Sequence, residues 1–135
     1  MQADTLTVIQ TYYDCFNKQD IQSFLALLDN QVVHDINQGA SEVGIEAFSQ
    51  FMNRMNNAYQ EKVKDLVIMA NQDGSRASAE FIIDGIYLAT DSDLPKANHQ
   101  PYSLRCGAFF EVKNSKITRV TNYYNMQDWL KQVNE

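Results

Sequence analysis

The sequence predicts an α+β fold in which helices pack against one side of a strongly curved, mostly antiparallel sheet. The N-terminal half has apolar residues at helical spacing, whereas the C-terminal half contains four long runs typical of strands. One of these runs carries Gly85 at its centre, where a strand can bend. Helices and strands that are segregated in this way are typical of α+β layers. A sheet that curls under such helices would enclose an apolar pocket, so we expect a cone.

Three helices are expected before the long strands. The first is capped by Asp4 or Thr5, and its apolar side chains recur every three or four residues over about three turns. A second, shorter helix is capped by Asp20 and continues through the leucines at 25, 27 and 28. The third covers about 45–59 and has a regular apolar face.

A short strand lies between the second and third helices, and the remaining strands follow the third. The short strand covers about 32–36 and runs into a turn at Gly39, after which 39–44 is expected to be a polar connection. The later strands are expected at 61–69, 77–89, 102–113 and 117–125, with a short C-terminal helix at 126–133. The segments with strong helical periodicity therefore precede the four long strands along the chain.

Composition limits the class of protein. A length of 135 residues predicts one domain, 1–135, with a core that needs no metal or disulfide. The formal net charge of −6 argues against nucleic acid or an anionic membrane as the main partner. No apolar run approaches the ~20 residues needed to span a bilayer, and the first residues show no secretory signal. Cys15 and Cys106 are expected to be buried free thiols, which predicts a cytoplasmic protein.

The stretch 32–39 is the first candidate for a functional site. Asp35 lies at the end of a strand beside the expected core, where it could act as a general base or as a polar anchor for a ligand. It could instead cap the backbone amides of the turn that ends at Gly39. His34 precedes it and faces the other side of an ideal strand, so a His34–Asp35 dyad is not expected. His34 could be a structural residue with its nitrogens hydrogen-bonded in the core, or it could line the pocket.

Two further groups are candidates, and a metal is not expected. Tyr12 could present its hydroxyl to the pocket or could lie in the core, with that hydroxyl bound by a strand. His99 lies between two prolines in a loop that is either solvated or a lid. A metal site would need His34, His99 and Asp35 to converge, and no H-x-H or H-E-x-x-H spacing supports it. The scattered glycines form no phosphate-binding loop, so we expect no cofactor.

Several segments resemble the ketosteroid isomerase and SnoaL-like group of the NTF2-like superfamily. They are Q-T-Y-Y-D-C-F-N (10–17) followed by Asp20, V-H-D-I-N-Q-G (33–39), and G-I-E-A-F (44–48). A subgroup of ketosteroid isomerase-related proteins is also similar at A-E-F (79–81), A-F-F-E-V (108–112), and R-V-T-N-Y-Y-N (119–125) with Trp129. The resemblance covers nearly the whole chain and implies an NTF2-like cone, with three N-terminal helices on the curved sheet.

The resemblance also implies candidate roles for single residues. Ketosteroid isomerases use a strand Asp as base, and a Tyr with a second, protonated Asp to hold the enolate oxygen. These roles fall on Asp35 and Tyr12, but the second acid falls at Ala108, where this sequence has none. Tyr87, Tyr124 or His99 could supply the missing donor from elsewhere. The candidates for substrate binding are His34, Asn37, Tyr87, His99 and Tyr124.

Two functions are therefore expected for this chain. The first is an isomerase or polyketide cyclase-like enzyme that binds a small apolar carbonyl compound, with Asp35 as base and Tyr12 as donor. The second is a non-catalytic module that binds a ligand or associates through its sheet, which the lack of an acid at Ala108 favours. A homodimer through the outer face of the sheet is expected in either case.

Overall fold

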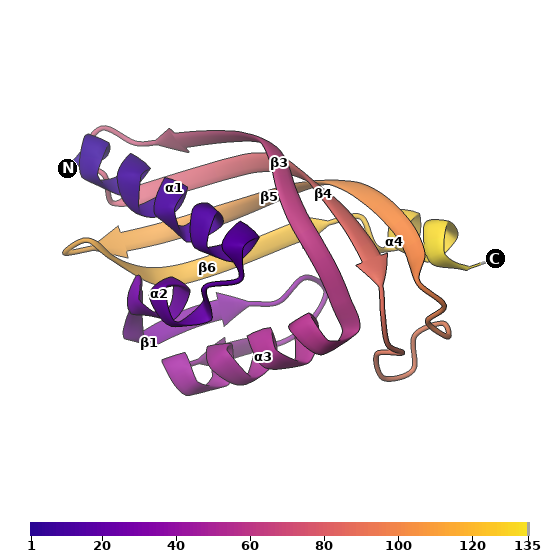
Figure 1. Cartoon of the computed structure of the whole chain (residues 1–135). Helices are drawn as coiled ribbons and strands as arrows, with labels where there is room; N and C mark the ends of the chain where they lie inside the picture. The colour runs from indigo at the N-terminus through magenta and orange to yellow at the C-terminus, as the bar shows by residue number, and fades with distance from the viewer. Residues whose placement is uncertain (135) are drawn as a thin grey trace.

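Three helices cover the concave face of one curved sheet in the computed structural model, which describes residues 1–134 (Figure 1). The helices α1 (Gln2–Lys18), α2 (Ile21–Ala26) and α3 (Ile45–Ala58) lie in front of the strands in this view, and α4 (Met126–Val133) lies at one end of the sheet. The predicted α+β architecture, with its curved sheet and C-terminal helix, is confirmed.

The sheet contains six strands in the order β2-β1-β6-β5-β4-β3. Their bounds are β1 (Leu28–Asp35), β2 (Ser41–Val43), β3 (Tyr59–Ala70), β4 (Arg76–Tyr87), β5 (Gln100–Lys113) and β6 (Lys116–Tyr124). All neighbouring pairs are antiparallel except β1 and β6, which are parallel. Register shifts interrupt β3 between Lys64 and Val67 and β5 between Glu111 and Val112. Such irregularities bend the long strands toward the helices.

Two short segments differ from the sequence prediction. Leu28, expected at the end of the second helix, begins β1 and pairs with Ile117 of β6. The segment Ser41–Val43, expected to be a polar connection, forms β2 and pairs with the end of β1. Both segments gain strand hydrogen bonds from partners that become neighbours only in the fold, and local propensity does not report these partners.

Alternation along each strand separates the core from the outer face. On β5, the side chains of Tyr102, Leu104, Cys106, Ala108 and Phe110 all point to the concave face and are buried. α1 packs onto this face and is tied to β3 at its C-terminal end by a pair of hydrogen bonds. The Asn17 side chain donates to the Val63 carbonyl at 2.9 Å and accepts from the Val63 amide at 2.7 Å.

The structure also tests the predictions for the two cysteines, for Gly85 and for membrane-spanning segments. Cys15 and Cys106 are both free and buried, as expected. For Gly85 the sequence is compatible with either a bulge or a bend in its strand, and the bulge is wrong because the register runs without a shift across this glycine. Among the helices of residues 1–134, none has the length and apolar character needed to cross a membrane.

Candidate functional site

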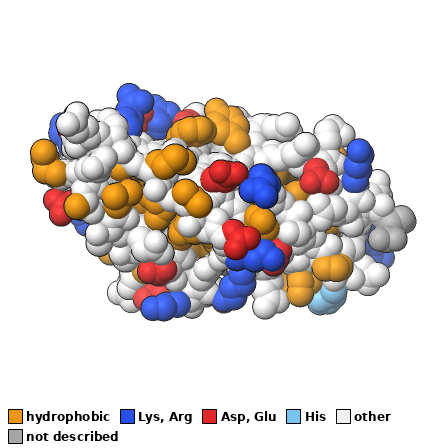
Figure 2. Space-filling view, turned by 90° about the horizontal axis from the view of Figure 1, so that it is seen from above, with side chains coloured by type: hydrophobic (Ala, Val, Ile, Leu, Met, Phe, Trp, Pro, Cys, Tyr) orange, Lys and Arg blue, Asp and Glu red, His pale blue; other side chains and the backbone are white. Residues whose placement is uncertain are grey.

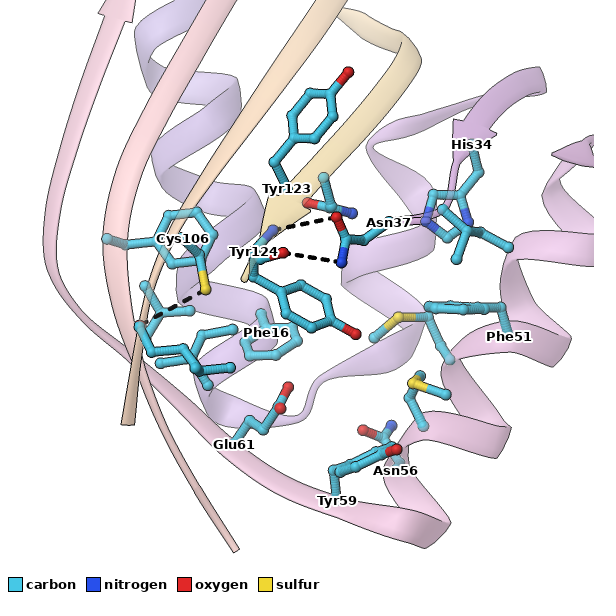
Figure 3. Close-up of a pocket in the computed structure, with 18 of the residues that line it drawn as sticks. Phe16, His34, Asn37, Phe51, Asn56, Tyr59, Glu61, Cys106, Tyr123 and Tyr124 are labelled. Carbon is cyan, nitrogen blue, oxygen red and sulfur yellow. Dashed lines mark hydrogen bonds between the residues drawn. The ribbon is translucent and has the colours of Figure 1, made fainter. Parts of the chain in front are cut away.

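A cavity of about 280 Å³ lies between the helices and the concave face of the sheet. Its wall is mainly aromatic and aliphatic, with contributions from α1, α2, α3 and the inward-facing residues of β3 to β6. This volume is near the lower end of the range for small-molecule sites, ~300–1,000 Å³. A few polar side chains break the apolar wall, and Figure 3 shows several of them around the Tyr124 ring.

His34 of β1 is one of these polar groups. Its ring stacks on Phe48 with centroids 4.3 Å apart and meets Phe51 edge-on at 4.6 Å. The side chain is 2% exposed, and burial lowers its pKa to about 4 despite the opposing effect of Asp35. The imidazole is therefore neutral at neutral pH, with one donor and one acceptor nitrogen. Within residues 1–134, the buried Nδ1 has no hydrogen-bond partner.

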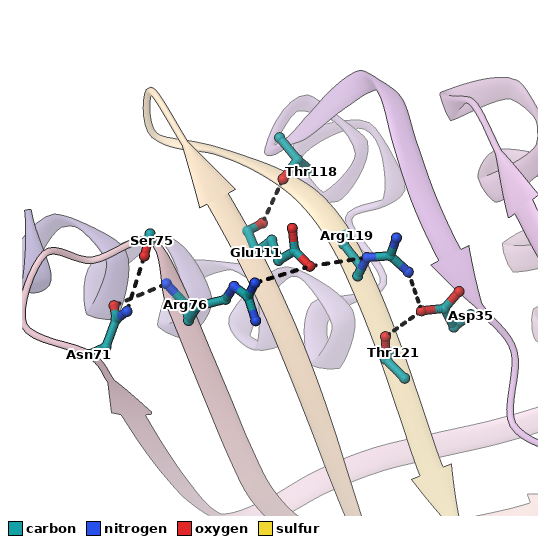
Figure 4. Close-up of polar contacts among 8 residues, drawn as sticks. All are labelled: Asp35, Asn71, Ser75, Arg76, Glu111, Thr118, Arg119 and Thr121. Carbon is teal, nitrogen blue, oxygen red and sulfur yellow. Dashed lines mark hydrogen bonds and ion pairs between the residues drawn. The ribbon is translucent and has the colours of Figure 1, made fainter.

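Asp35 is next in the chain but lies on the opposite, outer face of β1 (Figure 4). Its carboxylate accepts hydrogen bonds from Ser41 Oγ at 2.5 Å, Thr121 Oγ1 at 2.6 Å and an Arg119 guanidinium nitrogen at 2.6 Å. The bonds from Ser41 and Thr121 and the nearby Arg119 lower the pKa of Asp35 to about 2. The prediction that this carboxylate lies inside the cone is wrong, because it does not line the cavity. Strand alternation gives the inward position to His34.

Tyr12 does line the cavity, as expected. Its ring belongs to an aromatic cluster, 4.4 Å from Phe24 and 5.4 Å from Phe110 between ring centroids. Burial raises the pKa of its hydroxyl well above the ordinary value, so the phenol stays protonated and can donate. The structure thus does not bring the predicted pair together, since Tyr12 is inside the cone and Asp35 is outside it.

The other predicted binding residues divide into two groups. Asn37 and Tyr124 line the cavity, and the Asn37 side chain is bound to the backbone of Tyr124 by two hydrogen bonds, of 3.1 and 3.3 Å. Tyr87 and His99 do not line it. The Tyr87 hydroxyl donates to the Pro95 carbonyl at 2.6 Å and so holds the β4–β5 loop, while His99 is exposed in that loop. The cavity candidates are thereby reduced to His34, Asn37 and Tyr124.

Glu61 of β3 is a cavity residue that the sequence reasoning missed. Its carboxylate accepts a hydrogen bond from the Tyr102 hydroxyl at 2.5 Å, and burial raises its pKa although this hydrogen bond opposes the rise. Residues 61–65 include four charged residues and show only a weak alternation with apolar ones, a pattern typical of an exposed edge strand. The available signal was that Glu61 shares its face with Val63, which is buried.

No group of three His, Cys, Asp or Glu side chains within residues 1–134 is arranged to hold a metal ion. Ala108, where the resemblance places a second acid, is 1% exposed and lies on the apolar inward face of β5. Its cross-strand partner Asn122 lines the cavity and brings a neutral amide to that level.

The model of the SnoaL-like domain matches residues 9–120 of this chain. The chain belongs to the SnoaL-like domain family. A comparison of this SnoaL-like protein with curated proteins found no match.

Solved structures resemble this SnoaL-like protein over nearly its whole length. A provisionally assigned polyketide cyclase from Pseudomonas putida KT2440 is 52% identical, with 93% of this chain and 95% of that chain covered and a TM-score of 0.93. Another, from Silicibacter sp. TM1040, is 43% identical, with 100% and 99% covered and a TM-score of 0.96. An LEH-like epoxide hydrolase from Mycobacterium tuberculosis is 16% identical, with 98% and 86% covered and a TM-score of 0.75, and shares the fold alone.

Proposed function

We propose that this SnoaL-like protein binds a small apolar carbonyl compound in the cone and rearranges or cyclises it by proton transfer next to the carbonyl. The observation that carries the proposal is His34, a neutral imidazole in an apolar wall whose buried Nδ1 has no hydrogen-bond partner among residues 1–134. A buried polar group without a partner costs roughly 1–3 kcal/mol, which a hydrogen bond to a ligand would recover.

The chemistry of the wall supports a carbonyl as the polar part of that ligand. The imidazole of His34 is neutral and the phenols of Tyr12 and Tyr124 keep their protons, so each of these cavity groups can donate to a carbonyl oxygen without bringing a net charge. Donors of this kind stabilise the oxygen most when charge develops on it during enolisation, and one donor is worth ~10²–10³ in rate.

The similar solved structures also support a reaction at a carbon next to a carbonyl. Both close structural relatives carry a provisional assignment as polyketide cyclases. Cyclisation by an aldol step and isomerisation of an unsaturated ketone both begin with removal of a proton α to a carbonyl. We therefore propose proton transfer at that carbon as the shared step.

Binding can be tested with the one tryptophan of the sequence as a reporter, because Trp129 is 3% exposed and lines the cavity. Each cyclic ketone of a panel is titrated beside the hydrocarbon that lacks the carbonyl, with Trp129 fluorescence as the signal. One added hydrogen bond predicts that the ketone binds about 2- to 12-fold more tightly than the hydrocarbon. His34→Phe should remove this preference, whereas His99→Phe, outside the cavity, should keep it.

Turnover is tested on the same ketones in D2O by loss of the α-proton signal in the NMR spectrum. We expect faster loss with the protein than in buffer for at least one ketone. A ketone that binds with the stated preference but exchanges at the buffer rate would favour the non-catalytic binding module. Equal affinity for ketones and hydrocarbons would contradict the proposal.

A further inference from the structure

Three residues stand directly opposite one another across three strands of the sheet. Glu61 on β3 pairs with Gly85 on β4, and Gly85 pairs with Tyr102 on β5. Residues paired in this way share a face, which here is the concave one. A Cβ atom placed on Gly85 would lie 2.3 Å from Tyr102 Cζ, so a side chain at this position would overlap the ring. The missing side chain lets the Tyr102 ring lie across β4 and reach Glu61.

Tyr102 is held firmly in this position. Its side chain is 4% exposed, and its ring lies 6.1 Å from Trp129 and 6.5 Å from Tyr59, edge-on to both. Its hydroxyl donates to Glu61 Oε2 at 2.5 Å. Gly85 of β4 and Trp129 of α4 both pack against the Tyr102 ring, so the hydroxyl that binds Glu61 is held in place.

The Tyr102 hydrogen bond engages Oε2 of Glu61, which leaves Oε1 for a ligand. Glu61 lines the cavity, and Figure 3 shows its carboxyl pointing into the space between Phe16 and Tyr124. His34 lies beyond the Tyr124 ring in the same view, on β1, and three strands separate β1 from β3 in the sheet. A ligand in the cavity would thus have a neutral imidazole on one side and a carboxyl group on another.

We propose that Glu61 is the catalytic base of this cavity and that Tyr102 is the residue that positions it; the inference rests on the proposed function. Glu61 Oε1 accepts the proton from the carbon α to the ligand carbonyl, and the electron pair of that C–H bond forms the enolate. In an isomerisation, the same carboxylic acid returns the proton to another carbon of the ligand. In a cyclisation, the enolate carbon bonds to a second carbonyl carbon, and the resulting alkoxide takes the proton from Glu61.

The surroundings of Glu61 suit this role. Burial raises the pKa of the carboxyl group toward working pH, which strengthens it as a base, and the Tyr102 hydrogen bond partly offsets the rise. Several elements that form the cavity also carry titratable or charged side chains, which must be considered in any pH profile. They are Tyr12 and Tyr13 on α1, His34 on β1, Arg54 on α3, Tyr59 on β3, Asp91 in the β4–β5 loop, Cys106 on β5, and Tyr124 on β6.

The test compares Glu61→Gln with Glu80→Gln, using α-proton exchange of a bound ketone in D2O. Glu80 is exposed on β4 and pairs with Arg105 outside the cavity, so it receives the same chemical change away from the site. We expect Glu61→Gln to lower the exchange rate at least about 100-fold, the lower limit for general base catalysis, and to keep ketone binding by Trp129 fluorescence. Glu80→Gln should exchange like the wild type.

Tyr102→Phe tests the positioning role through the pH–rate profile of exchange, which a loss of packing alone would not shift. The Tyr102 hydrogen bond lowers the pKa of Glu61, so its removal raises that pKa. Exchange needs the carboxylate, and its rate falls as pH drops through the pKa; we therefore expect the acid limb of the pH–rate profile to move to higher pH. An unmoved limb would overturn the role of Tyr102.

Separate outcomes decide between the two proposals. Exchange by Glu61→Gln within threefold of the wild type would overturn Glu61 as base and leave the proposed function in place. No exchange by the wild type with any ketone would overturn the proposed function and this inference with it. If Glu61→Gln fails to fold by circular dichroism, Glu61→Asp replaces it: a retracted carboxyl should slow exchange but keep the acid limb, and an unchanged rate would count against Glu61.

Discussion

His34 and Asp35 are adjacent in β1, yet their side chains lie on opposite faces of the sheet. The His34 ring packs between Phe48 and Phe51 inside the cone. The Asp35 carboxylate is bound on the outer face by Arg119, which in turn contacts Glu111 at 3.2 Å (Figure 4). The predicted acid is therefore part of an ion-pair network, and the histidine beside it faces the ligand space.

Asp35 is expected to contribute to stability rather than to ligand binding. Asp35→Asn removes a charge that three donors stabilise, so we expect a loss of about 1–3 kcal/mol in the free energy of unfolding at pH 7. Because the folded pKa of about 2 is below the unfolded value, this contribution is present above pH ~4 and is lost as pH falls toward 2. Urea unfolding at several pH values checks this. An unchanged ketone affinity in Asp35→Asn is part of the prediction, and a loss of affinity would contradict it.

The lowered pKa of His34 predicts a second pH dependence of stability, at higher pH than that of Asp35. The unfolded chain protonates this histidine near pH 6.5, whereas the folded protein does so only near pH 4. Protons therefore favour the unfolded state, and stability should fall as pH drops from about 6.5 to 4. The urea midpoint of the wild type should decrease across this window, and His34→Gln should reduce the decrease. His99→Gln, in the exposed loop, serves as the control and should retain it.

Gly85 is predicted to be intolerant of a side chain because the Tyr102 ring occupies the space. Gly85→Ala should destabilise the protein by about 1–3 kcal/mol through overpacking, measured by urea unfolding. Gly107→Ala is the matched control, since a Cβ there meets only the Ala79 carbonyl at 3.8 Å, an ordinary contact. Combining Gly85→Ala with Tyr102→Ala should give less loss than the sum of the two changes. Additive losses would show that the ring does not cause the intolerance.

The outer face of the sheet is predicted to bind a second copy of this chain. Phe109 and Tyr123 are more than half exposed and their rings touch edge-on at 5.9 Å between centroids. Figure 2, seen from above, shows acidic and basic side chains beside one another among hydrophobic ones. Arg105 and Glu80 form an exposed pair of opposite charge across β5 and β4, at 3.1 Å. Neighbouring charges of both signs are complementary to a second copy of the same surface.

Sedimentation equilibrium is expected to give the mass of two chains for the wild type. Phe109→Lys should give one chain, because it places a charge in the apolar part of this face. Thr7→Lys adds the same charge on the exposed side of α1 and should leave the mass at two chains. A wild-type mass of one chain at high protein concentration would refute the dimer.

The sequence by itself determined the helices, the long strands, the α+β class and the separation of His34 from Asp35, because these depend on periods of 3.6 and 2 residues along the chain. Periodicity tells which side chains share a face, but not which face the helices will cover. The tertiary structure decided that His34 points inward and that Arg119, 84 residues away, binds Asp35. It also decided the position of Glu61, a half-buried side chain that lines the cavity only because the sheet curls over it. Its partner Tyr102 is 41 residues away and reaches it across Gly85, a contact that no local pattern encodes.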